Sequence, residues 1–297
     1  MRLTLRQLEI FRAIALTGST TAAAHRVPLS QSATSAALNE LEAALGDRLF
    51  DRVGKRLLLN DNGRALLPMA LAVLDGARSV ETALLLSDPS RRVDLRLHAS
   101  TTIGNYVLPD LLAQFRAHSA NARFDLRIGN TLDAVNAVLN FSADLGFIEG
   151  PCHSPDVAVT PWLEDEHVMG AAPAHVLARA AKRGRLTVKQ LRPAQWLLRE
   201  PGSGTREAVE QALQPHLITL EPAMTLGSSE AIKNSVAAGF GVSCLSRYVV
   251  QDLVRAHRLN VLATRLPRLT RRFALIHHKS KLLSDSLRKF VAHCAAA

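Results

Sequence analysis

The sequence has few of the features that mark secreted, membrane-spanning or metal-binding proteins. Its 297 residues include only three cysteines, which are widely spaced and form no Cys-x-x-Cys pair: Cys152, Cys244 and Cys294. A disulfide framework or a structural zinc site is therefore not expected. No apolar run approaches the roughly 18 residues that cross a bilayer. Arg6, Glu9 and Arg12 interrupt what would be the apolar core of a signal peptide. We expect a cytoplasmic protein in a reducing compartment, without a membrane partner.

The motifs of common enzyme classes are also missing. The sequence contains no Walker or dinucleotide-binding glycine motif. A nucleophile elbow needs glycine two residues before and after the serine, whereas Ser203 has Pro201 and Thr205 at those positions. Two adjacent pairs, Cys152-His153 and His277-His278, would point to opposite faces of a strand and could not share a metal. We expect no enzyme, hence no catalytic residue, no cofactor and no metal site.

The composition is that of a soluble globular protein with a basic surplus. The chain is 47% apolar and 21% charged, and its length suits two or three domains. The formal charge of +10 suits a polyanion such as DNA. However, residues 1–60 carry eight basic and five acidic residues, whereas residues 253–297 carry ten basic residues and one acid, Asp285. The charge alone does not locate DNA binding, and a solvated basic face is an equal alternative for the C-terminal cluster.

The first 46 residues show the pattern of a helix-turn-helix. Apolar spacing predicts helices over 4–17, 21–26 and 31–44, with Thr4 and Ser30 as N-terminal caps and glycines at the ends of the first and third. Two short helices joined by a tight turn form the motif that places its second helix in the major groove.

A hairpin and a long helix are predicted next. Two strand-like runs flank residues 53–55, which predicts a wing. Residues 61–86 form a helix whose apolar positions alternate by four and three in the manner of a coiled coil. These positions are Leu66, Ala70, Val73, Ala77, Val80 and Leu84. We expect the helix to form a dimer, the alternative being a helix packed within its own domain. Residues 87–92 read as a linker.

Beyond this linker, strands alternate with helices, which predicts an α/β domain with a parallel sheet and two lobes. Strands are expected at 93–100, 123–130, 143–149, 157–162, 241–245 and 273–277, and helices at 106–118, 132–140, 207–213, 229–238 and 281–294. The predicted domains are a winged helix-turn-helix at 1–60, a dimerisation helix and hinge at 61–92, and an effector-binding domain at 93–297. Within that last domain, lobe I covers about 93–161 and 267–297, and lobe II about 162–266.

Candidate DNA contacts lie on the third helix and the wing. Polar side chains near the helix start are available to the major groove: Gln31, Ser32, Thr34 and Ser35. The apolar side chains expected to pack inward are Ala33, Ala37, Leu38 and Leu41. Cations on the wing would contact phosphates and fix register: Arg48, Arg52, Lys55 and Arg56. The alternative is that the polar residues only cap the helix.

Two corners of the last domain could bind an anion. One is Ser100-Thr101-Thr102, after the first strand and before a helix expected near Asn105. The other is the glycine-rich turn 199–205, which leads into a helix near Arg206 and begins with Arg199. Hydroxyls, helix N-terminal amides and a guanidinium suit a small oxyanion, although each could be an ordinary cap or turn. Glu149 would repel that anion unless it pairs with Arg199 or accepts a proton held by the ligand.

The stretch from Phe11 to Phe50 resembles the signature of LysR-type transcriptional regulators. The matching segments are Thr17-Gly18-Ser19, Ala22-Ala23-Ala24, Ser30 to Ser35, Leu41-Glu42 and Leu45 to Phe50. Ser32 stands where proline is common, and Pro28 falls in the turn. The resemblance implies a winged domain joined by a linker helix to an effector domain like a periplasmic binding protein. It also implies double-stranded promoter DNA as a partner and a tetramer, whereas the sequence itself supports only the dimer formed by the long helix.

The second half resembles one branch of that family, which contains CysL-like regulators of sulfite and cysteine metabolism and CbbR-like regulators of carbon fixation. The resemblance lies in Ala99–Tyr106, Leu145–Gly150, Leu198–Arg206 and Leu226–Lys233. It implies sulfite or a related small anion as effector, with a metabolite phosphate or organic acid as the competitor. The binding residues it implies are Ser100, Thr101, Thr102, Arg199, Ser203 and Thr205, with Asn130 and Glu149 in addition. A solute-binding protein of a transport system is the alternative from another class, but it would not need residues 1–92.

Overall fold

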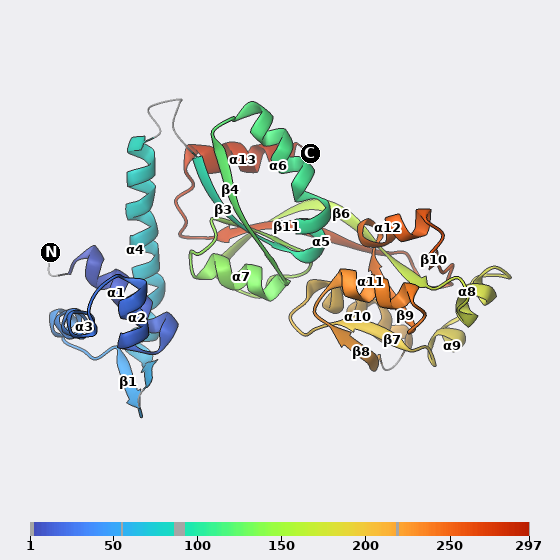
Figure 1. Ribbon diagram of the computed structural model, residues 1–297, viewed down its shortest axis with the longest axis horizontal. Coiled ribbons are helices and arrows are strands. Elements are labelled where there is room, and N and C mark those ends of the chain that lie inside the picture. The colour runs from blue at the N-terminus through green and yellow to red at the C-terminus, as the bar shows by residue number, and fades with distance from the viewer. Residues whose placement is uncertain (1–2, 55, 86–92, 218–219, 297) are drawn as a thin grey trace. The chain divides into compact units, whose positions relative to one another are not determined.

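The computed structural model describes residues 3–54, 56–85, 93–217 and 220–296 (Figure 1). The chain divides into two compact units. The first contains Met1–Arg91 with Ser280–Asp285, and the second contains Arg92–Lys279 with Ser286–Ala297. The predicted linker at 87–92 lies outside the described residues. Among the described residues, no helix is long and apolar enough to span a membrane.

The first unit begins with three helices around an apolar core. They are α1 (Leu5–Thr17), α2 (Thr20–Arg26) and α3 (Gln31–Leu45). Thr4 caps α1 through a reciprocal pair of hydrogen bonds with Gln7, and Ser30 Oγ accepts a 3.2 Å hydrogen bond from the Ala33 amide. Gly18 and Gly46 end α1 and α3 in left-handed conformations, with φ of 65° and 82°. The predicted helix starts and ends are confirmed within about one residue.

The wing and the long helix follow as predicted. Strands β1 (Phe50–Val53) and β2 (Arg56–Leu59) pair antiparallel across the turn. Phe50 packs its ring 5.5 Å from that of Phe11, which ties the wing to the helices. Helix α4 (Asp61–Leu85) starts where Asn60 Oδ1 accepts a 2.9 Å hydrogen bond from the Gly63 amide.

The predicted coiled-coil positions on α4 divide into two groups. Ala70 is buried and Leu66 is partly buried in the core of their own unit, as the alternative of intramolecular packing expects. Val73 and Val80 are 49% and 60% exposed, and Met69 beside them is 65% exposed. The Leu84 side chain lies outside the described residues. The helix therefore packs on its own domain along one stripe and leaves a second apolar stripe exposed.

The second unit is built on one twisted sheet with the strand order β4-β3-β5-β11-β6-β9-β7-β8, and β10 pairs with β6. The strands are β3 (Val93–Ser100), β4 (Ala122–Gly129), β5 (Leu145–Ile148), β6 (Val157–Ala171), β7 (Trp196–Arg199), β8 (Pro222–Leu226), β9 (Val242–Ser246), β10 (Asn260–Val261) and β11 (Leu269–His278). The helices are α5 (Thr101–Tyr106), α6 (Leu108–His118), α7 (Thr131–Leu139), α8 (Val176–Ala181), α9 (Val188–Leu191), α10 (Gly204–Leu217), α11 (Ser229–Ala237), α12 (Arg247–Arg255) and α13 (Asp285–Ala295).

The sheet is mixed, so the prediction of a parallel sheet is wrong at its centre. Strand β3 pairs parallel with β4 and β5, and β7 pairs parallel with β8 and β9. Strands β6 and β11 pair antiparallel and run from the first lobe into the second (Figure 1). We predicted that this strand ends at Trp162, but β6 continues to Ala171. Beyond Trp162, β11 places Arg272 opposite Glu164 and Arg271 opposite Asp165.

The helices also differ from the prediction at the corners that matter for binding. Helix α5 begins at Thr101, directly after β3, instead of near Asn105, and α6 is a separate helix. Helix α10 begins at Gly204 instead of near Arg206. Helices α8, α9 and α12 and strand β8 were not predicted. Helix α7 packs on β3 and β5, and α10 and α11 pack on β7 and β9, so each lobe has its own helical cover.

Candidate DNA-binding surface and effector site

One polar side chain of α3 that we predicted to face DNA is buried instead. Thr34 is fully buried with Leu38 and Leu41, and its Oγ1 donates a 2.9 Å hydrogen bond to the Ser30 carbonyl oxygen. Ala33, predicted to be buried, is exposed. The inward stripe therefore follows positions i, i+4 and i+7 from Thr34. Thr34 is removed from the residues that could contact bases.

The other polar residues of α3 remain accessible. Gln31 and Ser32 are exposed, and Ser35 is half-buried. Gln31 Nε2 donates a 3.3 Å hydrogen bond to Thr20 Oγ1 of α2, which orients the side chain at the start of the helix. These three residues share the outer face on which a recognition helix carries its base contacts.

The wing presents a row of cations. Arg48, Arg52 and Arg56 are exposed, and none of them forms an ion pair within the part of the chain that the structure describes. Lys55 lies outside the described residues. Exposed guanidinium groups at a hairpin suit phosphate oxygens, which they can bind in a bidentate manner.

The two predicted corners of the effector domain come together at the junction of its lobes, around an arginine that the sequence analysis missed. Arg271 of β11 is 5% exposed in its side chain. Its Nε donates a 2.8 Å hydrogen bond to Asp165 Oδ2, and its Nη1 lies 3.0 Å from Glu149 Oε2. Its Nη1 also donates to Thr205 Oγ1 at 3.0 Å, and its Nη2 donates to Thr102 Oγ1 at 3.5 Å.

The sequence contains a charge pattern that could have indicated the pairing of Arg271 with Asp165. Arg271 and Arg272 stand opposite Asp165 and Glu164 in the register of β11 and β6. Complementary charge runs of this kind indicate paired strands. The sequence did not show that Arg271 and Asp165 face the interior while Arg272 and Glu164 face solvent, because that depends on the strand register.

Glu149 pairs with Arg271 and not with Arg199, so the first of the two alternatives considered for this carboxylate does not apply. Glu149 Oε1 accepts a 2.5 Å hydrogen bond from the Thr102 amide at the start of α5, and Oε2 accepts one of 2.7 Å from Thr205 Oγ1. Burial raises the pKa of this carboxyl, but Arg271 and these hydrogen bonds outweigh it and lower the pKa overall. The Thr102 amide, which was expected to donate to a bound anion, thus donates to the Glu149 carboxylate instead.

Arg199 is also buried and already has a counterion. It is 2% exposed, and its Nε and Nη2 each lie 2.8 Å from the Glu200 carboxylate. Its Nη1 donates to Thr101 Oγ1 at 2.6 Å and to Ser229 Oγ at 2.9 Å. Thr101 belongs to the first lobe and Ser229 to the second. The guanidinium therefore connects the lobes but does not offer an unbalanced charge to a ligand.

Asn130 is placed at the same junction. It caps α7 through the Asp133 amide, and its Nδ2 donates a 3.2 Å hydrogen bond to Glu200 Oε1. This bond and the Arg199 guanidinium lower the pKa of Glu200 against the opposing effect of burial, which is the largest single cause. Asn130 positions the Glu200 carboxylate from the opposite lobe.

The glycine-rich turn brings the lobes into close approach. A Cβ on Gly204 would lie 2.6 Å from Thr131 Oγ1 and 2.9 Å from the Glu149 carbonyl carbon. A Cβ on Gly150 would lie 3.0 Å from the Cα of Gly204. Ser203 beside it is buried. The glycines are thus needed for contact between the lobes, which the sequence alone could not separate from an ordinary turn.

Two buried hydroxyls at this junction lack a hydrogen bond of good geometry within the described residues. They belong to Ser100, at the end of β3, and to Thr131, at the start of α7. Ser100 lies near enough to Glu149 to help lower the pKa of the Glu149 carboxyl, but the two side chains do not have the geometry of a hydrogen bond. Buried hydroxyls without partners are costly, so they are groups that a ligand could satisfy.

Burial shifts the pKa of other titratable groups at the junction in the direction that favours their neutral forms. Burial lowers the pKa of His167 well below its usual value, and it raises the pKa of the Asp165 carboxyl despite Arg271. Burial also raises the pKa of the Cys244 thiol to about 12. All three cysteines are free thiols. A buried thiol with so high a pKa is a poor nucleophile.

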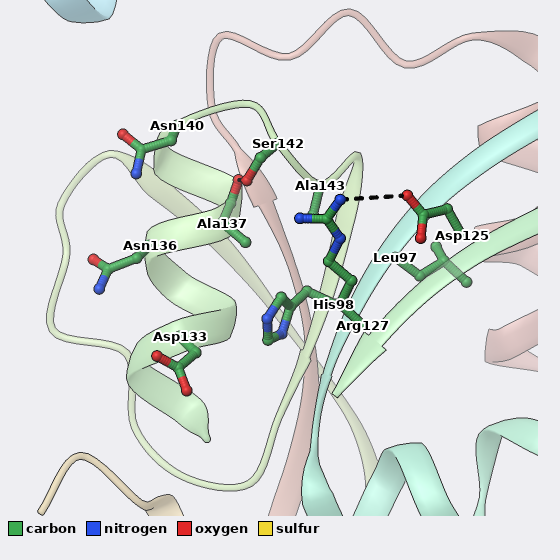
Figure 2. Close-up of a pocket in the computed structure, with 10 residues that line it drawn as sticks. All are labelled: Leu97, His98, Asp125, Arg127, Asp133, Asn136, Ala137, Asn140, Ser142 and Ala143. Atoms are coloured by element: carbon green, nitrogen blue, oxygen red, sulfur yellow. Dashed lines mark hydrogen bonds and ion pairs between the residues drawn. The ribbon is translucent and has the colours of Figure 1, made fainter. Parts of the chain in front are cut away.

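A separate groove of about 280 Å³ lies on the surface of the first lobe (Figure 2). It is lined by Leu97, His98, Asp125, Arg127, Asp133, Asn136, Ala137, Asn140, Ser142 and Ala143. Arg127 lies 3.8 Å from Asp125, and both side chains are largely exposed. Burial lowers the pKa of His98. Since its only permanent cation stands among two carboxylates, this groove is a weaker anion site than the lobe junction.

Family models match both halves of the chain. The model of the bacterial regulatory helix-turn-helix protein of the LysR family matches residues 5–64, and that of the LysR substrate-binding domain matches residues 90–297. The chain belongs to the LysR family of DNA-binding transcriptional regulators. The alternative of a transport solute-binding protein does not account for the first of these matches.

Individual relatives confirm the predicted branch. The chain is 50% identical to the uncharacterized HTH-type transcriptional regulator YeiE of Escherichia coli K12, over 100% of this chain and 99% of the relative. It is 29% identical to the HTH-type transcriptional regulator CysL of Bacillus subtilis, over 95% and 93%. The solved regulatory domain of Synechocystis CcmR in complex with 2-PG is 28% identical, covers 69% of this chain and 97% of its own, and has a TM-score of 0.62.

Proposed function

We propose that this regulator senses a small oxyanion at the lobe junction, and that sulfite is the effector, so that it controls genes of sulfur and cysteine metabolism. The observation that carries the proposal is the junction itself. Two buried arginines, Arg199 and Arg271, stand among hydroxyls from both lobes, and two of the buried hydroxyls lack a hydrogen bond of good geometry to any residue that the structure describes. A ligand that pairs with groups from both lobes would shift the equilibrium between their arrangements.

The charge balance of the junction favours an oxyanion that carries a proton. Two arginines face three carboxylates, those of Glu149, Asp165 and Glu200. A fully ionised anion would add to this negative surplus, whereas a protonated one can donate a hydrogen bond to Glu149. Bisulfite, the protonated form of sulfite, meets this requirement. Sulfate has no proton at neutral pH and does not.

A thermal-shift titration tests the effector. Purified protein is titrated with sulfite, sulfate, inorganic phosphate, sugar phosphates and organic acids, because a ligand that binds only the folded state raises the apparent stability. We expect sulfite to raise the melting temperature and sulfate to leave it unchanged. Glu149→Gln should reduce this selectivity, since a carboxamide has no negative charge to repel sulfate.

A metabolite phosphate is the second candidate. The supporting observation is the likeness to the CcmR regulatory domain, whose solved complex holds 2-PG. A shift with 2-PG or another phosphate ester, and none with sulfite, would support this candidate and reject sulfite.

The assembly that we propose is a homodimer through the exposed stripe of α4, with two dimers forming a tetramer on promoter DNA. The exposed side chains of Met69, Val73 and Val80 support the dimer. The protein would act in the cytoplasm, where bacterial promoter DNA lies. No metal or cofactor is part of this proposal.

A further inference from the structure

The effector domain carries a strongly basic surface at the far end of its second lobe. Two stretches of the chain contain no acidic residue, His167–Arg199 with seven arginines and lysines and Leu253–Ser284 with eight. Helix α8, the end of α12 and β10 line one groove of the second lobe (Figure 1), and several exposed cations of the two stretches lie on these elements or in the loops next to them. We call this the basic end. Its members are Lys182, Arg183, Arg185, Arg255, His257, Arg258 and Arg265.

Backbone contacts bring the two stretches side by side. The Leu186 amide donates a 2.8 Å hydrogen bond to the Ala263 carbonyl oxygen, and the Arg265 amide donates one of 2.9 Å to the Leu186 carbonyl oxygen. Lys182 from one stretch and His257 from the other line one groove of about 390 Å³. The clustering of the cations is therefore a consequence of the fold, and it is not visible in either stretch alone.

These cations lack counterions that similar residues nearby possess. In the same domain, Arg247 and Arg268 both pair with Glu166 at 2.8 Å, and Arg206 pairs with Glu210 at 2.7 Å. No arginine or lysine of the basic end forms an ion pair with any residue that the structure describes. Asp252, the acid of α12, instead pairs with Lys233. Like charges that lie close together without counterions destabilise the folded state. The stability of the fold therefore does not explain why these cations are present.

Helix dipoles explain the positions of only some cations of the basic end. Lys182 follows the last residue of α8 and Arg255 lies in the last turn of α12, where cations are stabilised by the helix C-terminus. Arg183, Arg185, Arg258 and Arg265 lie beyond these helix ends. All four are arginines, whose planar guanidinium groups bind phosphate in a bidentate manner.

We propose that the basic end contacts the phosphates of DNA, in addition to the contacts of the winged domain. DNA is the polyanion that this family binds, and arginines without counterions suit its phosphates. An acidic protein partner fits less well, because the groove has no phenylalanine, tyrosine or tryptophan among its lining residues. Aromatic side chains dominate the energetic centres of protein interfaces.

The test is the salt dependence of DNA binding by the full chain. A long random-sequence duplex is titrated at several salt concentrations with wild type and with the variant Arg183→Gln/Arg185→Gln/Arg258→Gln/Arg265→Gln. The slope of log K against log salt should become shallower by about 0.9 for each phosphate contact that is removed. All four side chains are exposed, so the fold should be retained, and circular dichroism checks this.

The matched control is Arg116→Gln/Arg123→Gln/Arg127→Gln/Arg192→Gln, which removes the same charge from exposed positions elsewhere on the domain. We expect its slope to stay within the error of the wild-type slope. Equal slopes for the two variants would overturn the proposal, because net charge alone would then account for the effect. A wild-type slope in the basic-end variant would also overturn it and would favour an acidic protein partner.

Discussion

At the scale of single residues, neighbouring arginines have opposite environments. Arg271 lies inside the lobe junction against Glu149 and Asp165, whereas Arg272 is largely exposed beside Glu164. Removing one member of a buried ion pair leaves the other charge buried without a partner, which is costly. An exposed pair is screened by water and contributes little.

The difference between these neighbours can be measured by chemical denaturation. Arg271→Ala should lower the free energy of unfolding by about 3–5 kcal/mol. Arg272→Ala should lower it by less than about 1 kcal/mol, because its partner stays hydrated. Similar losses for both variants would mean that the cluster around Glu149 does not stabilise the folded domain.

At the scale of elements, the face of α3 decides which side chains can meet DNA. The burial of Thr34 leaves Gln31 and Ser35 as the base-contact candidates on that helix together with Ser32. Each good base contact contributes about 1–3 kcal/mol to discrimination.

Operator binding tests this face. With an operator selected from a random DNA pool, Gln31→Ala/Ser35→Ala should weaken specific binding by tenfold or more, on the order of 1.4 kcal/mol. Thr34→Val should keep operator affinity, because its side chain faces the core. If the double variant binds the operator as tightly as wild type, α3 does not read the bases.

The exposed apolar stripe of α4 is the proposed dimer interface. Val73→Glu/Val80→Glu should convert a dimer to a monomer in sedimentation or light-scattering measurements, because charges would replace apolar contacts at the interface. Glu81→Lys on the same helix is the control, since it changes charge without removing apolar surface. A variant that remains dimeric would place the interface elsewhere.

At the scale of the whole molecule, Arg199 connects the lobes on whose arrangement the response to effector depends. Its hydrogen bonds reach Thr101 on one lobe and Ser229 on the other. Arg199→Ala should abolish the thermal shift and the change in operator binding caused by effector, while operator affinity without effector stays near wild type. Arg247→Ala, an exposed arginine of the same domain, is the control. An unchanged response at the same effector concentration would exclude Arg199 from the site.

Much of this architecture was readable from the sequence because its signals are local. Caps at Thr4 and Ser30 and the glycines 18 and 46 set the ends of the first helices within a few residues of each other in the chain. The signature between Phe11 and Phe50 identified the family, and the strand and helix alternation after residue 93 predicted the α/β domain. The hydroxyls and Arg199 of both corners were likewise found from their positions at strand ends.

Tertiary structure alone decided the electrostatics of the effector site. Whether Glu149 pairs with Arg199 or with Arg271 depends on the register of β6 and β11, which joins residues more than a hundred positions apart. The inward face of α3 depended in the same way on which side packs against α1. Local propensities determine where helices and strands begin and end. The partner of a buried charge is determined by strand pairing between residues far apart in the chain, because a register shift of one residue moves a side chain from the buried face of a sheet to the exposed face.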